Sequence, residues 1–368
     1  MVFRLHAINA NEGDCLLLEY GNKEPRYMLF DGGPKDIWTE HLEPTLRRLG
    51  NPTIDVMALT HVDTDHTTGL RDMLSALQAE VGDAGAASIT VGALWMNAFD
   101  EILDEDGALR NDLESLMSMA AAASVSLAAT GFALQGVKDG NDVRVRAALL
   151  GIKRNPPWEG KPILVGANPG KVTLENLTFT TVGPTKGALD DLKAEWKAWI
   201  AKQRARLNDN KPAFAAMADK SVPNLSSLQF LVEAGGRRLL LTGDGRGDHL
   251  LEGLAAAELL DEGEGIDVDV LKLPHHGSDR NVNRDFFRRV RAQTYVVSAD
   301  GKNGNPDLAT LQWIVEEAKR AARRIDLVAT NSTDSIDQLL ASHPPAENGY
   351  HLQIRSPNRH RITIDLQD

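Results

Sequence analysis

The stretch "ALTHVDTDHTTGL", residues 58–70, decides the fold of this chain. It continues the apolar run "IDVMALT" (54–60), which is typical of a buried strand. Directly after that run come four side chains that can bind a metal ion, namely His61, Asp63, Asp65 and His66. At this spacing in a turn, their nitrogen and oxygen atoms can converge on a divalent cation. If Asp65 only capped a helix beginning near Thr67, one residue of the four would be explained. The stretch therefore predicts a metal site.

Three other apolar runs also end in polar residues. Asp31 follows "YMLF", Asp244 follows "RRLLLTG", and His275 and His276 follow "VLKLP". Taken alone, each aspartate is typical of a turn, whereas a His-His pair before a glycine is rarer. Together they follow one rule, a polar residue at the tip of a buried strand, where α/β enzymes tend to place their chemistry.

Composition indicates an ordinary globular protein. The 368 residues can bury a large core, with 42% hydrophobic and 25% charged residues. No run approaches the roughly 18 apolar residues of a membrane span, and the first residues lack a signal-peptide pattern. Cys15 is the only cysteine, which rules out an internal disulfide and fits a reducing compartment. We therefore expect a cytoplasmic protein with no membrane partner.

The formal net charge of −12 counts against a surface generally adapted to nucleic acid. Local basic clusters nevertheless occur, each typical of a solvated helix or strand face. They lie at 193–206, 280–291, 319–324 and 355–361. A local basic strip is therefore left open.

Predicted strands dominate both ends of the chain. Before residue 61 the predicted elements are strands at 2–8, 15–20, 27–30 and 54–60 and a helix at 36–50. After residue 222 they are a hairpin at 226–244, strands at 267–278 and 292–300, a helix at 307–324 and a closing hairpin at 350–366. This order predicts two sheets in the interior with helices outside.

The middle of the chain, 71–222, is less regular. It contains an Ala-rich helical stretch near 108–130, a strand-like passage at 172–184 and an amphipathic helix near 187–206. We expect a single domain over 1–368, with 71–222 as a helix-rich insertion within it.

The set "FDGG", "THVDTDH", "LLLTGDG" and "LPHHGS" resembles the metallo-β-lactamase superfamily. Within that superfamily it looks most like the metallo-β-lactamase-like domain of the DNA-uptake family ComEC/Rec2, whose opening strand pair is similar to "NANEGDCLLLEYG". The resemblance covers roughly 1–70 and 224–310. It implies a fold of the α/β (α+β) class, a four-layer αββα sandwich, and two divalent metal ions.

The resemblance also implies a role for each motif residue. His61 and Asp63 would face the first metal ion, and Asp65 and His66 the second. Asp244 would bridge the two ions. The last ligand, on the second ion, would be His275 or His276, and Asp31 would orient the motif from behind the ligands.

Two departures from the superfamily pattern bear on the metal. Asp63 stands where a second histidine is usual, and Asn224 stands in the place of a third histidine. The site is thereby richer in oxygen, which favours Mn²⁺ or Mg²⁺ over Zn²⁺. Asn305 also replaces a histidine often found in the ComEC/Rec2 branch, which puts a phosphate-binding role there in doubt.

The resemblance implies a metal-dependent hydrolase, a phosphodiesterase or nuclease acting on DNA or another nucleic acid through a water activated by two Zn²⁺ or Mn²⁺ ions. Asp65 and the histidine pair would be catalytic. The histidine that is not a ligand would contact a phosphate oxygen or protonate the leaving group. Ser278 and Arg280 follow closely and are candidates for holding phosphate.

Two alternatives remain open from the residues. One is a hydrolase of a small substrate such as a cyclic nucleotide, a phosphocholine ester or a lactone, which the acidic surface favours. The other is a binding or scaffold protein with a vestigial metal site, whose helical middle contacts a protein partner. Asn224 favours this second alternative, whereas Asp244 and the His-Asp-Asp-His run weigh against it.

Overall fold

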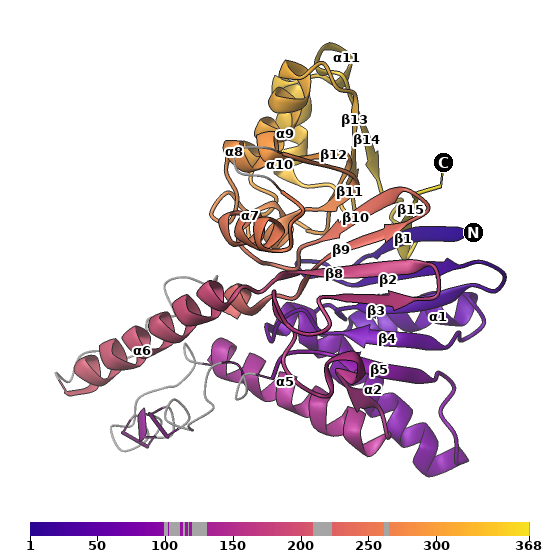
Figure 1. The fold of residues 1–368 in the computed structure, drawn as a ribbon, viewed down its shortest axis with the longest axis vertical. Helices are drawn as coiled ribbons and strands as arrows, with labels where there is room; N and C mark the ends of the chain where they lie inside the picture. The colour runs from indigo at the N-terminus through magenta and orange to yellow at the C-terminus, as the bar shows by residue number, and fades with distance from the viewer. Residues whose placement is uncertain are drawn as a thin grey trace.

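Two β-sheets pack face to face and carry helices on their outer surfaces in the computed structural model (Figure 1). The structure describes residues 1–98, 131–208, 223–260 and 265–367, with a few single positions between 102 and 119. The Ala-rich stretch expected near 108–130 lies almost entirely outside the described residues. Among the described helices, none combines the length and the apolar character needed to cross a membrane.

The first sheet has seven strands and is antiparallel at one side and parallel at the other. In spatial order they are β15 (Arg361–Asp365), β1 (Val2–Ile8), β2 (Leu16–Gly21), β3 (Arg26–Phe30), β4 (Ile54–Ala58), β5 (Val91–Trp95) and β6 (Lys153–Arg154). The pairs from β3 to β6 are parallel, so β3 and β4 end at the same edge of the sheet.

The second sheet has eight strands. In spatial order they are β14 (Tyr350–Ile354), β13 (Ile325–Ala329), β12 (Val290–Val297), β11 (Ile266–Lys272), β10 (Arg237–Leu241), β9 (Gln229–Ala234), β8 (Leu177–Gly183) and β7 (Lys171–Leu174). The pairs from β10 to β14 are parallel, so five carboxyl ends lie at one edge. The remaining pairs are antiparallel.

Helices cover the outer face of each sheet. Against the first sheet lie η1 (Trp38–Leu42), α1 (Glu43–Arg48), α2 (Thr64–Ala84) and α5 (Gly131–Leu149). Against the second lie α7 (Gly247–Ala256), α8 (Arg284–Arg289), α9 (Leu308–Arg320) and α10 (Asp334–Ser342), with α11 (Pro345–Asn348) next to α9. Helix α6 (Lys186–Asn208) extends away from the sheets at the lower left of Figure 1. Three short helical turns complete the elements, η3 (Pro156–Trp158), η4 (Pro223–Ser226) and η5 (Pro274–Gly277).

Buried side chains form three apolar layers, as a four-layer sandwich requires. In β2, Leu16, Leu18 and Tyr20 lie in the layer between the sheets. Leu17, one residue out of phase, lies in the layer beneath α2, because successive side chains of a strand point to opposite faces. A third layer separates the second sheet from its helices. The expected αββα sandwich is confirmed.

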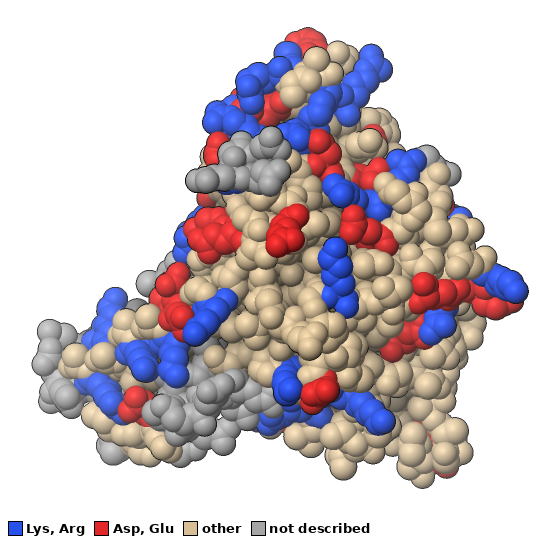
Figure 2. Space-filling model, viewed as in Figure 1, with Lys and Arg blue, Asp and Glu red and all other residues tan. Residues whose placement is uncertain are grey.

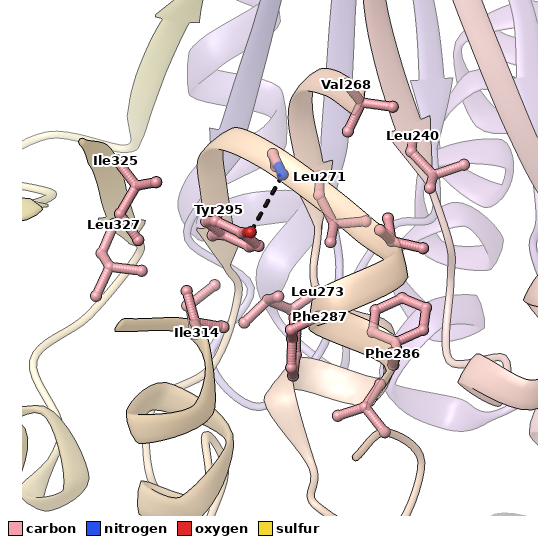
Figure 3. Close-up of a cluster of buried hydrophobic side chains, with 14 of the residues drawn as sticks. Leu240, Val268, Leu271, Leu273, Phe286, Phe287, Tyr295, Ile314, Ile325 and Leu327 are labelled. Atoms are coloured by element: carbon pink, nitrogen blue, oxygen red, sulfur yellow. Dashed lines mark hydrogen bonds between the residues drawn. The ribbon is translucent and has the colours of Figure 1, made fainter. Parts of the chain in front are cut away.

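Large side chains fix the helices over the second sheet, as Figure 3 shows. Leu271 of β11 and Tyr295 of β12 are fully buried beside Phe287 of α8 and Ile314 of α9. The Tyr295 hydroxyl accepts the Ala292 N–H at 3.1 Å, so its polar atom is satisfied inside the layer. Burial of such side chains contributes roughly 1.5–3 kcal/mol each. This packing holds the loop after β11 in place.

Two sequence-based expectations need correction. The middle region 71–222 is not only a helix-rich insertion, since β5 and β6 extend the first sheet and β7 and β8 extend the second. The tail 350–366 is not a hairpin, because β14 pairs with β13 whereas β15 pairs with β1 of the other sheet. Alternation in the sequence identifies a strand but not the sheet that it joins. The expectation of a single domain stays a prediction.

Candidate metal centre

The predicted motif begins where β4 ends. Asp63 is the N-cap residue of α2, so Asp65 and His66 lie in the first helical turn and Asp65 is not the cap. The Asp63 carboxylate makes no capping hydrogen bond and lies 3.7 Å from His61 Nε2. The helix start thus presents its acidic groups toward the histidines.

Close backbone contact between two glycines brings Asp31 to the motif. Gly69 of α2 lies so near Gly32 that a Cβ atom on either would meet the other's backbone, at 1.9 Å for Gly69. Asp31 accepts the Thr60 N–H at 2.8 Å and the His66 Nδ1 proton at 2.8 Å. This bond fixes the His66 tautomer, leaving Nε2 as the ligand atom. The geometry fits the expected orienting position of Asp31.

Two more imidazoles are oriented in the same way. His61 Nδ1 lies 3.0 Å from Thr60 Oγ1, and His276 Nδ1 lies 2.8 Å from the Ser298 carbonyl oxygen. Because a carbonyl only accepts, the His276 proton lies on Nδ1. In each ring, Nε2 is left without a hydrogen bond.

Asp244 follows β10 and lies at the centre of these three rings. Its Oδ2 atom is 3.2 Å from His66 Nε2, 3.1 Å from His276 Nε2 and 4.0 Å from His61 Nε2. Asp65 reaches the same place, with Oδ2 3.8 Å from His276 Nε2. Residues as far apart in sequence as His61 and His276 therefore converge at one edge of the two sheets.

The donor set fits divalent metal ions. Among the described residues, oxygen and nitrogen atoms lie within 4.8 Å of one another in four groups of three, which include His61 with His66 and Asp244, and Asp65 with His66 and His276. The Nε2 atoms of all three histidines and Asp244 Oδ1 are buried without a hydrogen bond. Leaving a buried polar atom unpaired costs about 1–3 kcal/mol, and coordination to a cation would recover that cost.

His275 and His276 differ although they are adjacent. The His276 side chain is 3% exposed and the His275 side chain 17%. His275 Nδ1 lies 2.6 Å from Asn281 Oδ1, and its Nε2 lies 3.8 Å from Asp244 Oδ2. Asn224 Nδ2 approaches the His275 ring at 3.4 Å, so Asn224 borders the site. The geometry favours His276 as the ligand and leaves His275 nearer to solvent.

Asp14 and Lys272 are site residues that the sequence reasoning missed. Both are buried, and Lys272 Nζ forms an ion pair with Asp14 and lies 3.6 Å from Asp244 Oδ1. Asp14 Oδ1 also lies 3.4 Å from His276 Nδ1. The available signals were "NEGD" before a strand and a lysine inside the apolar run "VLKLP", which is unusual for a buried strand.

Charges in this cluster shift one another's pKa values. Burial alone would lower the pKa of His276, but Asp244 and Asp14 raise it to about 10. Burial likewise opposes the charged form of Asp244, yet the surrounding histidines hold its pKa well below the usual range. Burial raises the pKa of Asp65, with Asp63 and Asp244 adding to the shift. The cluster therefore concentrates negative charge that a cation can neutralise.

Site residues also adopt left-handed backbone conformations. The φ angles are +57° at Asp31, +45° at His275 and +55° at His276. Such conformations cost on the order of 1–3 kcal/mol each at non-glycine residues and concentrate at functional sites. The fold holds these three side chains at the site at an energetic cost.

The other expected residues lie at the border of the cluster or outside it. Ser278 is buried, and its N–H donates to the His275 carbonyl oxygen at 2.9 Å. Arg280 is exposed. Asn305 Nδ2 donates to the His275 carbonyl oxygen at 3.4 Å. Cys15 is fully buried in the apolar layer under α2. A phosphate-holding role for Ser278 and Arg280 stays a prediction.

The first part of the chain matches a known protein family. A model of the metallo-beta-lactamase superfamily matches residues 9–82, which include Asp14, Asp31 and the motif 61–66. The expected resemblance to that superfamily is therefore confirmed over this segment.

Particular relatives match parts of the chain. ComE operon protein 3 of Bacillus subtilis is 33% identical over 108 residues, which cover 28% of this chain and 13% of that protein. Microtubule-associated protein 1A of Rattus norvegicus is 37% identical over 75 residues, which cover 20% of this chain and 3% of that protein. The chain thus spans a small fraction of these relatives. The crystal structure of the metallo-beta-lactamase fold protein YhfI from Bacillus subtilis aligns with 99% of this chain and 100% of its own, at 11% identity and a TM-score of 0.43.

Proposed function

We propose that this protein is a metal-dependent hydrolase that cleaves phosphodiesters, with DNA or another nucleic acid as its substrate class. The observation that supports the proposal most directly is the set of buried, unpaired ligand atoms around Asp244. The resemblance to the ComEC/Rec2 branch supports the choice of substrate.

The proposed ligands divide into two sets that share Asp244. His61 and Asp63 belong to the first, and Asp65, His66 and His276 to the second. Bound divalent ions would supply Lewis-acid polarisation of a phosphate oxygen and a lowered pKa for water. The Nδ1 partners Asp31, Thr60 and Ser298 hold the three imidazoles so that each Nε2 lies near Asp244, where the ions would bind.

His275 has a separate proposed role. Its ring is held by Asn281 and Asn224, is partly exposed, and points Nε2 toward Asp244. From this position it can donate a hydrogen bond to a non-bridging phosphate oxygen, or a proton to the leaving oxygen as the P–O bond breaks. Asp65 is also partly exposed. It is proposed both as a ligand of the second set and as a catalytic carboxylate facing the substrate.

The ligand chemistry favours hard cations. Three carboxylates and three imidazoles, with no thiolate, suit Mn²⁺ and Mg²⁺ better than a site with four nitrogen or sulfur ligands would. Zn²⁺ can occupy the same atoms. We therefore propose Mn²⁺ as the preferred ion, and the same atoms can also bind Zn²⁺ or Mg²⁺.

The proposal is tested with protein stripped by a chelator and reloaded with Mn²⁺, Zn²⁺ or Mg²⁺. Substrates would be bis-p-nitrophenyl phosphate, single-stranded DNA, plasmid DNA and, as a contrast, a lactone. We expect metal-dependent cleavage of the phosphodiesters and loss of that cleavage in Asp244→Asn. Hydrolysis of the lactone alone would instead establish the small-molecule alternative.

A further inference from the structure

A basic pocket is present apart from the metal centre. It is a cavity of about 400 Å³ at the junction of β14, β15 and α1, and its lining includes Arg48, Arg355, Arg359, His360 and Arg361 but no carboxylate. Elsewhere, the face shown in Figure 2 carries acidic and basic side chains interspersed. The chain has a net charge of −12, so a cavity lined only by basic and neutral side chains is unexpected and indicates a binding role.

The arginines of this pocket lack direct carboxylate partners among the described residues. In the part of the chain that the structure describes, no salt bridge joins any of the four to a carboxylate. Arg355 is buried and donates to the carbonyl oxygens of Thr330 and Ser356, at 2.9 and 3.0 Å. These neutral acceptors hold the loop in place, but they do not compensate the positive charge of Arg355. Glu19 acts on Arg361 from nearby but is already bonded to His6 at 3.0 Å.

Two histidines beside the pocket, His41 and His360, have lowered pKa values, to which nearby positive charges contribute. His41 Nδ1 lies 3.1 Å from His360 Nδ1. Burial lowers the pKa of His41 to about 4, with His360 and Arg355 adding to the shift. Burial also lowers the pKa of His360, and Arg48 contributes. An anion in the pocket would relieve this repulsion, which is how uncompensated basic clefts attract charged ligands.

The pocket and the metal centre lie at the same edge of the molecule. Strands β11 to β14 are parallel, so His276 after β11 and Arg355 after β14 follow carboxyl ends at one edge. β14 is the third strand along the sheet from β11. At about 4.8 Å per strand this separation is about 14 Å. On a duplex, where each strand carries one phosphate per about 3.4 Å of helix axis, it corresponds to about four nucleotides, and on an extended single strand to fewer.

The loop Asn9–Asp14 joins the two places. Asn9 N–H donates to the His360 carbonyl oxygen at 2.8 Å, and its side chain contacts His41 at 3.0 Å. At the other end of the loop, Gly13 packs against the backbone of Asp65, and Asp14 lies in the metal cluster. One short loop therefore sets the position of the pocket relative to the metal ligands.

We propose that the basic pocket binds backbone phosphates of a nucleic-acid strand whose scissile phosphodiester lies at the metal centre. The inference rests on the proposed function and adds to it the place on the protein that holds the strand, and with it a substrate several nucleotides long. Arg48 and Arg359, which are exposed, supply the phosphate contacts, whereas Arg355 holds the loop. An isolated phosphate ester or a cyclic nucleotide would not reach both places.

The test uses the double variant Arg48→Gln/Arg359→Gln. A matched control, Lys171→Gln/Arg324→Gln, removes the same charge from exposed residues outside both sites. Fluorescence anisotropy with a single-stranded oligonucleotide is measured in EDTA, so binding is read without turnover. We expect at least tenfold weaker binding in the double variant and less than threefold in the control. The slope of log affinity against log salt should fall by about 1.4, for two phosphate contacts at about 0.7 each on a single strand.

Cleavage by the metal-loaded proteins separates this inference from the proposed function. We expect the ratio of DNA to bis-p-nitrophenyl phosphate hydrolysis to fall at least tenfold in the double variant only. Equal DNA binding and an equal ratio in both variants would overturn the pocket assignment. If wild-type protein cleaves neither substrate, the proposed function fails, while the EDTA binding still decides the pocket. Arginine-dependent binding to phosphatidylglycerol vesicles without any effect on DNA would overturn the nucleic-acid assignment in favour of a lipid.

Discussion

The ammonium group of Lys272 lies 3.6 Å from Asp244 Oδ1, in a position closed to solvent. The same ammonium forms an ion pair with Asp14. Burial alone would lower the pKa of Lys272, but Asp14 and Asp244 raise it above its usual value. A fixed positive charge thus lies behind the proposed bridging carboxylate and compensates part of the acidic cluster.

Replacing Lys272 by Met keeps much of its volume but removes the charge. We expect the metal-free variant to lose about 3–5 kcal/mol of stability, because Asp14 is left buried without its partner. Added Mn²⁺ should recover part of the loss. Urea unfolding with EDTA and with Mn²⁺ measures both effects. Lys302→Met, which breaks the exposed pair with Glu12, is the control and should cost no more than about 1 kcal/mol. Equal stability of the two variants would argue against a buried ion pair at Lys272.

Asp31→Asn tests the orientation of His66. The amide can offer a donor where the carboxylate accepts the Nδ1 proton, so the favoured tautomer would change. We expect Mn²⁺ affinity to fall about 10–100-fold in isothermal titration calorimetry. Asp267→Asn, at an exposed pair with Arg291, is a control that should keep the wild-type affinity. Unchanged affinity in Asp31→Asn would remove Asp31 from the site.

We expect His275 and His276 to have different functions. His276→Ala should lower the metal content, since a buried ligand is lost. His275→Ala should keep its metal and lose turnover on bis-p-nitrophenyl phosphate, because its ring lies nearer to solvent. Elemental analysis and initial rates on the same preparations measure both. The reverse pattern would mean that His275 is the ligand.

Asn224→His places an imidazole beside His275. Asn224 is fully buried, and its Oδ1 has no hydrogen bond, so a ring nitrogen there can add a ligand atom. We expect higher Zn²⁺ affinity in this variant, measured by competition with a chelating dye. Asn224→Gln, which adds volume without an imidazole, is the control. Identical Zn²⁺ affinity in Asn224→His and wild type would show that position 224 does not reach the metal.

Much of the proposed site could be predicted because its residues directly follow apolar runs that predict buried strands. Asp31, Asp244 and His276 are examples. Asp14 and Lys272 could not be predicted, since one lies in an ordinary turn and the other inside a strand. Their proximity is created by the packing of two sheets, which no local pattern records. The sheet partners of β14 and β15 were missed for the same reason. The choice between His275 and His276 depended on the burial of each ring and on its distance from Asp244, which adjacent positions in a sequence do not reveal.

The central claim is that Asp244 anchors bound divalent ions. It is tested most directly by elemental analysis of wild type and Asp244→Asn after equilibration with Mn²⁺ or Zn²⁺ and removal of free metal. We expect up to two ions per wild-type chain and a clear loss in the variant, with both proteins folded by circular dichroism. Wild-type protein without bound metal, or equal metal content in the two proteins, would contradict the account.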